Sequence, residues 1–142
     1  MVSGSIDEIE LRRVSMPLVR PFRTSFGTWT ERDVLLVRVR SDGFEGWGEC
    51  VAGTRPTYSS EYTDGAHRVT ADVLGPQLVG APLDAAGAVE ALTPFKGHRM
   101  AKAALEGAVL DATLRRDGRS LASHLEGGLR HAMPLERGER LD

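Results

Sequence analysis

The residue types that carry out acid–base or metal chemistry are scattered along this chain. Its histidines are His67, His98, His124 and His131. They form neither H-x-x-x-H nor H-E-x-x-H, the patterns that place two metal ligands on one helix face. Glu45 and Glu49 share a face of an expected strand, but such acids usually form only its solvated surface. There is no phosphate loop, dinucleotide fingerprint or nucleophile elbow, so spacing alone predicts no catalytic site.

An unusual segment at residues 17–30, PLVRPFRTSFGTWT, combines two prolines, one glycine and three aromatic residues. Its aromatic residues are Phe22, Phe26 and Trp29. This composition predicts an ordered loop that carries apolar side chains. The aromatic rings either pin the loop to a sheet, or the loop closes over a pocket and presents Phe22 and Arg23 to a ligand. Tyr58, in the segment TYSSEY, is open to the same two interpretations.

The composition is that of an ordinary globular domain. The chain has 142 residues, a formal net charge of -2 and a pI near 6.1, with 18 basic residues scattered among 20 acidic ones. A chain of this length builds one domain, and the absence of a basic stripe argues against nucleic acid as a partner. Cys50 is the only cysteine, which excludes an internal disulfide and fits a cytoplasmic protein. No signal peptide and no long apolar window is found, so we expect no membrane.

Three segments show the alternation of half-buried strands. They are Ile6–Val14, Arg32–Arg40 and Phe44–Val51, the second placing Leu35, Val37 and Val39 opposite Leu36, Arg38 and Arg40. Short turn sequences between strands predict an antiparallel meander. Gly46 and Gly48 lie inside the third strand, where a missing side chain usually marks a close backbone approach or a bulge.

Helical signals follow the strands. We expect helices at Ser60–Leu74, ended by Gly75 and Pro76, at Asp84–Leu92, at His98–Arg116 and at Ser120–Gly127. The third of these has two apolar stripes side by side, which predicts a central helix buried on more than one side. Strands first and helices afterwards indicate an α+β fold, a three-stranded antiparallel meander followed by a helical bundle.

Several segments resemble one family in the same order along the chain. They are MPLVRPFRTSFGTWTERDVLLVRV, GWGEC, YSSEY, FKGHRMAKAALEGAVLDA and SLASHLEGG. They resemble the N-terminal capping domain of the o-succinylbenzoate synthase / N-acylamino-acid racemase branch of the enolase superfamily, of the mandelate racemase / muconate lactonizing enzyme type. The resemblance implies an enolase-type capping domain at residues 1–128, and a divergent tail at 129–142 where the catalytic (β/α) barrel would begin.

The resemblance also implies a role for two loops. In such enzymes the capping domain closes over the mouth of the barrel and contributes to substrate specificity. Carried over to this sequence, the closing loops are residues 20–27 and about 51–60. The implied substrate-binding residues are Phe22, Arg23, Gly53 and Tyr58.

Catalysis in relatives of this type depends on the barrel. They hold Mg²⁺ with barrel carboxylates and move a proton with barrel lysines, so a full-length relative would be an Mg²⁺-dependent lyase or racemase. The two lysines here, Lys96 and Lys102, both belong to the capping-domain match, and the sequence turns charged after Leu135. We therefore expect no catalytic residue, metal ligand or cofactor in this chain, and no turnover by it alone. Synthase and racemase chemistry both remain open for a full-length relative.

Other classes of function stay open as alternatives. The chain could be a free-standing small-ligand-binding module, or a structural module that pairs with another chain. We expect a small carboxylate substrate as a partner only where a barrel is supplied. A capping domain without its barrel exposes apolar surface, so we also expect self-association, with the tail Leu129–Asp142 able to pair or swap between copies.

Overall fold

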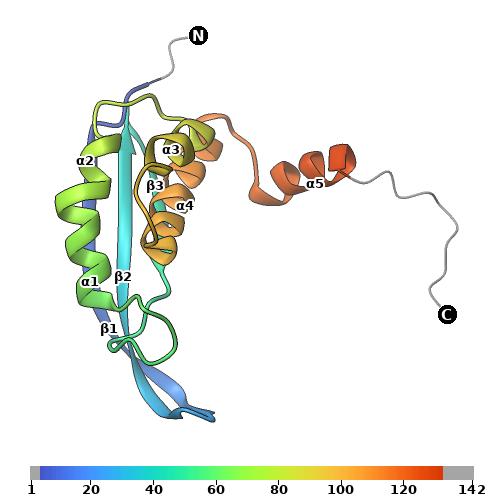
Figure 1. The fold of residues 1–142 in the computed structure, drawn as a ribbon. Helices are drawn as coiled ribbons and strands as arrows, with labels where there is room; N and C mark the ends of the chain where they lie inside the picture. Colours follow the sequence, from blue (N-terminus) through green and yellow to red (C-terminus); the bar gives the residue numbers. More distant parts are fainter. Residues whose placement is uncertain (1–3, 133–142) are drawn as a thin grey trace, which may run out of the picture.

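A computed structural model describes the backbone of residues 4–132 and the side chains of residues 4–128. Three antiparallel strands, β1 (Glu8–Thr24), β2 (Gly27–Ser41) and β3 (Phe44–Cys50), form one sheet in that order. The helical segments that follow are α1 (Thr63–Val69), η1 (Thr70–Leu74), α2 (Gly75–Leu78), α3 (Ala85–Leu92), α4 (Arg99–Arg116) and α5 (Leu121–Ala132) (Figure 1). The predicted α+β meander followed by helices is confirmed.

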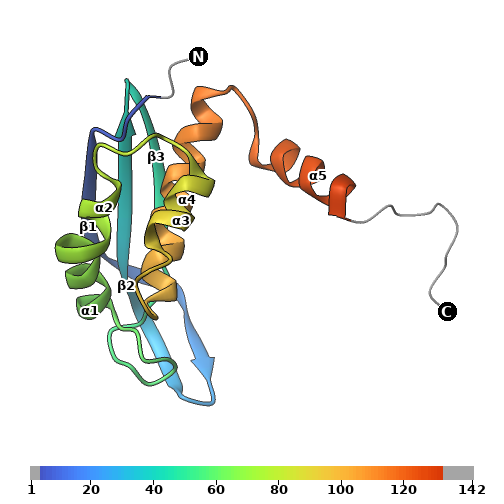
Figure 2. The same ribbon diagram turned by 45° about the horizontal axis from the view of Figure 1, so that its top comes forward.

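The helices α1 to α4 cover one face of the sheet, as Figures 1 and 2 show together. On β2 the predicted alternation is confirmed, because Leu35, Val37 and Val39 are buried in the core. Arg38 and Arg40 point to the opposite face, where they pair with glutamates of β1. The sheet therefore has one apolar face under helices and one charged face.

Glycines on β3 allow the central helix α4 to touch the sheet backbone. A Cβ atom at Gly46 would lie 2.2 Å from the Ala108 carbonyl oxygen, and one at Gly48 would lie 2.0 Å from that of Ala104. The close approach predicted from these two glycines is confirmed. Ala104 and Ala108 are themselves small and fully buried, so strand and helix meet almost backbone to backbone.

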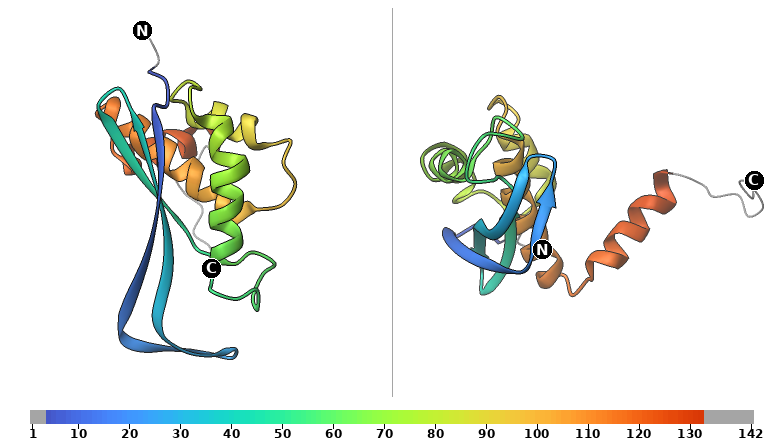
Figure 3. Two further views of the ribbon diagram at one scale, coloured as in Figure 1. Left: turned by 90° about the vertical axis from the view of Figure 1, so that its left-hand side faces the viewer. Right: turned by 90° about the horizontal axis from the view of Figure 1, so that it is seen from below.

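The prediction of a loop at residues 17–30 was wrong, because β1 and β2 continue as a long hairpin to Thr24 and Gly27. The register changes between the pairs Pro17–Glu31 and Phe22–Trp29, so residues 18–21 lie opposite a single residue of β2. Proline is tolerated here because β1 is an edge strand and the irregularity lies at the prolines. Beyond the irregularity the hairpin bends and projects past the helices (Figure 3, left).

The predicted helix end at Gly75 and Pro76 was also wrong. The helix passes through the π-helical segment η1, and the Gly75 N–H donates to the Thr70 carbonyl. Pro76 lies in α2 directly after this π-helical segment, where the i→i−5 bond already interrupts the regular α-helical hydrogen bonding. Helix α5 extends past the predicted Gly127, and in Figures 1 and 2 it leads away from the sheet. Of the tail at 129–142, residues 133–142 lie outside the described residues, and the boundary at 128 stays a prediction.

Candidate functional site

A pocket of about 390 Å³ lies where the bent hairpin tip meets the segment after β3. The hairpin contributes Phe22, Phe26, Trp29 and Arg32, the segment contributes Gly53, Arg55, Tyr58 and Glu61, and α4 contributes Met100. These walls come from three parts of the chain that are far apart in sequence. The site therefore exists only in the folded domain.

Three of the four aromatic side chains of the pocket stay accessible, and the fourth, Trp29, is half-buried. Phe22 is 62% exposed, Phe26 is 70% exposed and Tyr58 is 81% exposed, so these rings do not pin the hairpin to a core. The rings of Phe26 and Tyr58 meet edge to face with centroids 6.2 Å apart, which joins the two loops across the pocket. This arrangement favours the second of the two interpretations of the aromatic segment, a pocket wall.

Gly53 has a steric reason to lack a side chain. A Cβ atom there would lie 3.2 Å from the Trp29 ring, inside ordinary contact distance. The absence of a Cβ therefore lets the segment after β3 approach the hairpin. The Gly53 carbonyl also accepts a hydrogen bond of 2.8 Å from the Thr63 N–H at the start of α1.

Two arginines give the pocket a cationic side. The Arg32 guanidinium lies 5.7 Å from the centroid of the Trp29 ring and 3.9 Å from a Glu49 oxygen. Arg55 lines the pocket from the segment after β3. Guanidinium groups beside aromatic rings suit a small anion with an apolar part, because they supply charge-assisted hydrogen bonds next to apolar surface.

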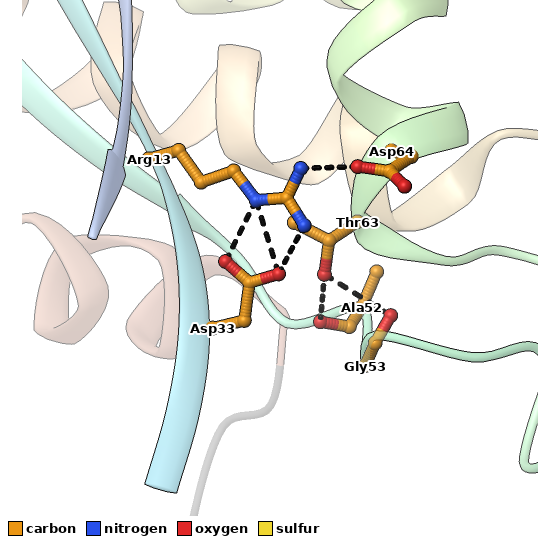
Figure 4. Close-up of polar contacts among 6 residues, drawn as sticks. All are labelled: Arg13, Asp33, Ala52, Gly53, Thr63 and Asp64. Atoms are coloured by element: carbon orange, nitrogen blue, oxygen red, sulfur yellow. Dashed lines mark hydrogen bonds and ion pairs between the residues drawn. The ribbon is translucent and has the colours of Figure 1, made fainter. Parts of the chain in front are cut away.

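A polar cluster fixes the hairpin relative to α1 (Figure 4). The Arg13 Nε donates to Asp33 Oδ1 over 2.8 Å, and another guanidinium nitrogen donates to Asp64 at the start of α1. The hydrogen bond from Arg13 lowers the pKa of Asp33, and the two carboxylates raise the pKa of Arg13. Thr63 Oγ1 donates to the carbonyls of Ala52 and Gly53 over 3.2 and 3.0 Å, which ties the same helix end to the pocket segment.

The residues singled out from the sequence are partly brought together. Phe22, Gly53 and Tyr58 line the pocket, whereas Arg23 does not. Neighbouring strand residues point to opposite faces, which separates Arg23 from Phe22. The roles of all four as substrate-binding residues stay predictions. Sequence reasoning did not single out Arg32, Arg55, Glu61 or Met100, which also line the pocket.

The described part of the chain does not fit a magnesium site. Among its residues no group of three or more His, Cys, Asp or Glu side chains is placed to hold a metal ion. Lys102 donates through Nζ to the Phe95 carbonyl and lines a different groove, between α3 and α4. Among the described helices none has the length and apolar character needed to cross a membrane.

Comparisons with known proteins agree on one family. Residues 7–125 match the family model described as mandelate racemase / muconate lactonizing enzyme, N-terminal domain. An N-succinylamino acid racemase from Amycolatopsis is 55% identical over 127 residues, which are 89% of this chain and 34% of the relative. An o-succinylbenzoate synthase from Bacillus subtilis is 38% identical over 91% of this chain and 35% of its own length. The chain thus spans about a third of the curated relatives it matches.

Two solved structures also match this chain over about a third of their own length. A member of the enolase superfamily from Listeria innocua superposes with a TM-score of 0.78 at 29% identity, covering 86% of this chain and 33% of that chain. A muconate lactonizing enzyme from Pseudomonas fluorescens, complexed with muconolactone, gives a TM-score of 0.76 at 29% identity, covering 81% and 32% respectively.

Proposed function

Since this chain belongs to the mandelate racemase / muconate lactonizing enzyme family and matches its N-terminal domain, we propose that it caps the active site of such an enzyme. The enzyme is of the o-succinylbenzoate synthase / N-acylamino-acid racemase type, and this domain contributes substrate specificity. The domain corresponds to residues 1–128.

One observation carries the proposal. The pocket is formed by the projecting hairpin tip and the segment after β3, and three of its four aromatic rings remain largely exposed. Exposed aromatic rings gathered at one end of a domain are suited to close on something else, because burying them is favourable by about 25 cal/mol for each Å². In this proposal they close on the mouth of a barrel.

The substrate in this proposal is a small carboxylate. Arg32 and Arg55 supply positive charge, and Phe22, Phe26 and Tyr58 supply apolar contact around it. The succinyl groups in the names of the relatives carry a carboxylate at the end of a short apolar chain. Such a ligand matches both sides of the pocket.

We further propose that residues 1–142 do not turn over substrate alone. Proton transfer and metal binding in this reaction class need side chains other than those of the pocket, and the described residues contain no fitting metal group. In this proposal the Mg²⁺ chemistry of the reaction class belongs to the barrel of the full-length enzyme and not to the described residues. The present residues bind and orient the substrate and exclude water.

A chimera tests the capping role. Residues 1–128 of this chain replace the matching third of the Amycolatopsis racemase, and kcat and KM are measured for N-succinylamino acids. We expect an active enzyme in which Phe22→Ala or Tyr58→Ala raises KM about tenfold, because each loses about 1–2 kcal/mol of apolar contact. Phe44→Ala is the matched control, since Phe44 is also exposed but lies at the other end of the sheet.

A folded chimera without activity would contradict the proposal, as would variants at Phe22 and Tyr58 that behave like the Phe44 control. The free chain decides the alternative of a small-ligand-binding module. Saturable binding of an N-succinylamino acid by residues 1–142, weakened by Tyr58→Ala in isothermal titration calorimetry, would favour that module.

A further inference from the structure

Helix α4 begins without a capping side chain from its own sequence. Its N-cap residue His98 has a left-handed backbone, with φ at 52°, and its side chain makes no capping hydrogen bond. The first N–H groups of any helix have no partner within the helix and need acceptors from elsewhere. The start of α4 is part-buried against the pocket segment, so these N–H groups require a protein acceptor.

Glu61 supplies that acceptor from a distant part of the chain. Its two carboxylate oxygens accept from the Met100 N–H over 3.0 and 2.9 Å, across 39 residues of sequence. One of them also accepts from the Ala101 N–H over 3.2 Å. A carboxylate at a helix N-terminus is favoured further by the helix dipole. The bond therefore holds α4 and the pocket segment together.

The same residues form a wall of the pocket. Glu61 and Met100 both line it, and Ser59 Oγ lies 3.8 Å from the Met100 sulfur. The other end of the segment is held at Gly53 through Thr63. Between these two anchors lies Tyr58, which is 81% exposed and meets the Phe26 ring edge to face. The position of its backbone is therefore set by the anchors on both sides.

We infer that Glu61 is a positioning residue, which places the 54–60 wall of the pocket by capping α4 from outside the helix. The inference rests on the proposed function for its consequence, the placement of Tyr58 over a substrate. It concerns a contact that no spacing pattern in the sequence reveals, because donor and acceptor lie on different elements.

The test compares two capping carboxylates. Glu61→Ala is set against Asp84→Ala, because Asp84 caps α3 from within its own sequence, accepting from Ala86 and Gly87. Both variants should lower Tm by about 2–6 °C through loss of a cap. In ¹H–¹⁵N heteronuclear NOE measurements, only Glu61→Ala should lower the values of residues 54–60 and speed amide exchange at Met100. Glu61→Gln, which keeps an acceptor oxygen, should restore most of the order.

In the chimera, Glu61→Ala should raise KM several-fold with little change in kcat, while Asp84→Ala leaves both unchanged. Equal loop order in Glu61→Ala and wild type, or equal loosening in Asp84→Ala, would overturn the inference. The NMR measurement needs no ligand and no barrel. Suppose that Glu61→Ala loosens residues 54–60, while Phe22→Ala and Tyr58→Ala leave the KM of the chimera unchanged. The proposed function would then be wrong, and the positioning role of Glu61 would still hold.

Discussion

At the scale of single residues, the contact between β3 and α4 depends on the absence of a Cβ atom at Gly48. An alanine there would place its Cβ 2.0 Å from the Ala104 carbonyl oxygen, and the nearest atoms it would meet all belong to the backbone of α4. We expect Gly48→Ala to lower the free energy of unfolding by about 3 kcal/mol or more, because strand and helix must separate. Urea unfolding followed by circular dichroism measures the change.

Gly107 provides the control on the facing helix. A Cβ there would lie 4.0 Å from the Gly48 Cα, an ordinary contact, so Gly107→Ala should stabilise α4 by about 1 kcal/mol. If Gly48→Ala were as stable as Gly107→Ala, the close packing of β3 on α4 would be refuted.

Asp33 should make stability depend on pH. The hydrogen bond from Arg13 lowers its pKa in the folded state, so its contribution is present above the unfolded pKa of about 3.9 and is lost as pH falls through the folded value. Asp33→Asn should lower stability by about 1 kcal/mol at pH 7. The difference from wild type should shrink progressively below about pH 4 in thermal melts.

The matched control for Asp33 is Asp72→Asn. Asp72 pairs with Arg68 over 3.7 Å on an exposed helix surface, so its loss should cost a few tenths of a kcal/mol at most. A constant difference between Asp33→Asn and wild type from pH 7 to pH 2 would show that the Arg13 contact does not act through the Asp33 charge.

At the scale of elements, the hairpin tip and the segment after β3 have little support from the core. We expect residues 20–27 and 51–60 to be the most dynamic parts of the described domain in the free chain. Amide hydrogen exchange should be faster at Phe22 and Tyr58 than at Ala104, which lies fully buried in α4. Exchange at Phe22 and Tyr58 as slow as at Ala104 would show that these segments are packed for structural reasons.

At the scale of the whole molecule, the proposal that these residues contact the substrate but do not bind Mg²⁺ predicts that the ion leaves the stability of the chain unchanged. A ligand that binds only the folded state raises Tm, and the described residues contain no group fitted to the ion. Millimolar Mg²⁺ should leave the Tm of residues 1–142 unchanged in differential scanning fluorimetry, with EDTA as the reference. A rise of several degrees would reveal metal ligands in this chain.

The exposed apolar side chains predict self-association of the free chain. Met16, Val19, Phe22 and Phe26 on the hairpin are at least half exposed, as are Leu121 and Leu125 on α5. Sealing a few hundred Å² on each partner would contribute several kcal/mol before association entropy is subtracted. Sedimentation at micromolar concentration should show a dimer or larger species.

Repeating the sedimentation with a chain that ends at Gly128, and with Leu125→Glu, locates the contact. Loss of the dimer in both the shortened chain and the Leu125→Glu variant would assign the contact between copies to α5 and the following residues. Retention in both would assign it to the hairpin end. A monomer for the full chain at every concentration would exclude self-association.

The sequence alone was enough for the parts of this protein that repeat a local pattern. The alternation on β2, the stripes of α4 and the glycines of β3 each reflect the geometry of a single element, so they predicted the meander and the central helix. The family could likewise be recognised from the sequence, because its motifs occur in the same order along the chain. Phe22 and Tyr58 were singled out from the aromatic composition of their own segments, and the resemblance then implied their role.

Tertiary structure decided what depends on residues distant in sequence. The prolines of β1 indicate a loop when read locally, but pairing with β2 carries the strand past them, because an edge strand accepts an irregularity there. Gly75 and Pro76 likewise did not end their helix, because a π-turn absorbs the break. The bond from Glu61 to the start of α4 and the cluster of Arg13, Asp33 and Asp64 join separate elements. Such contacts follow from how elements pack, which no local period encodes.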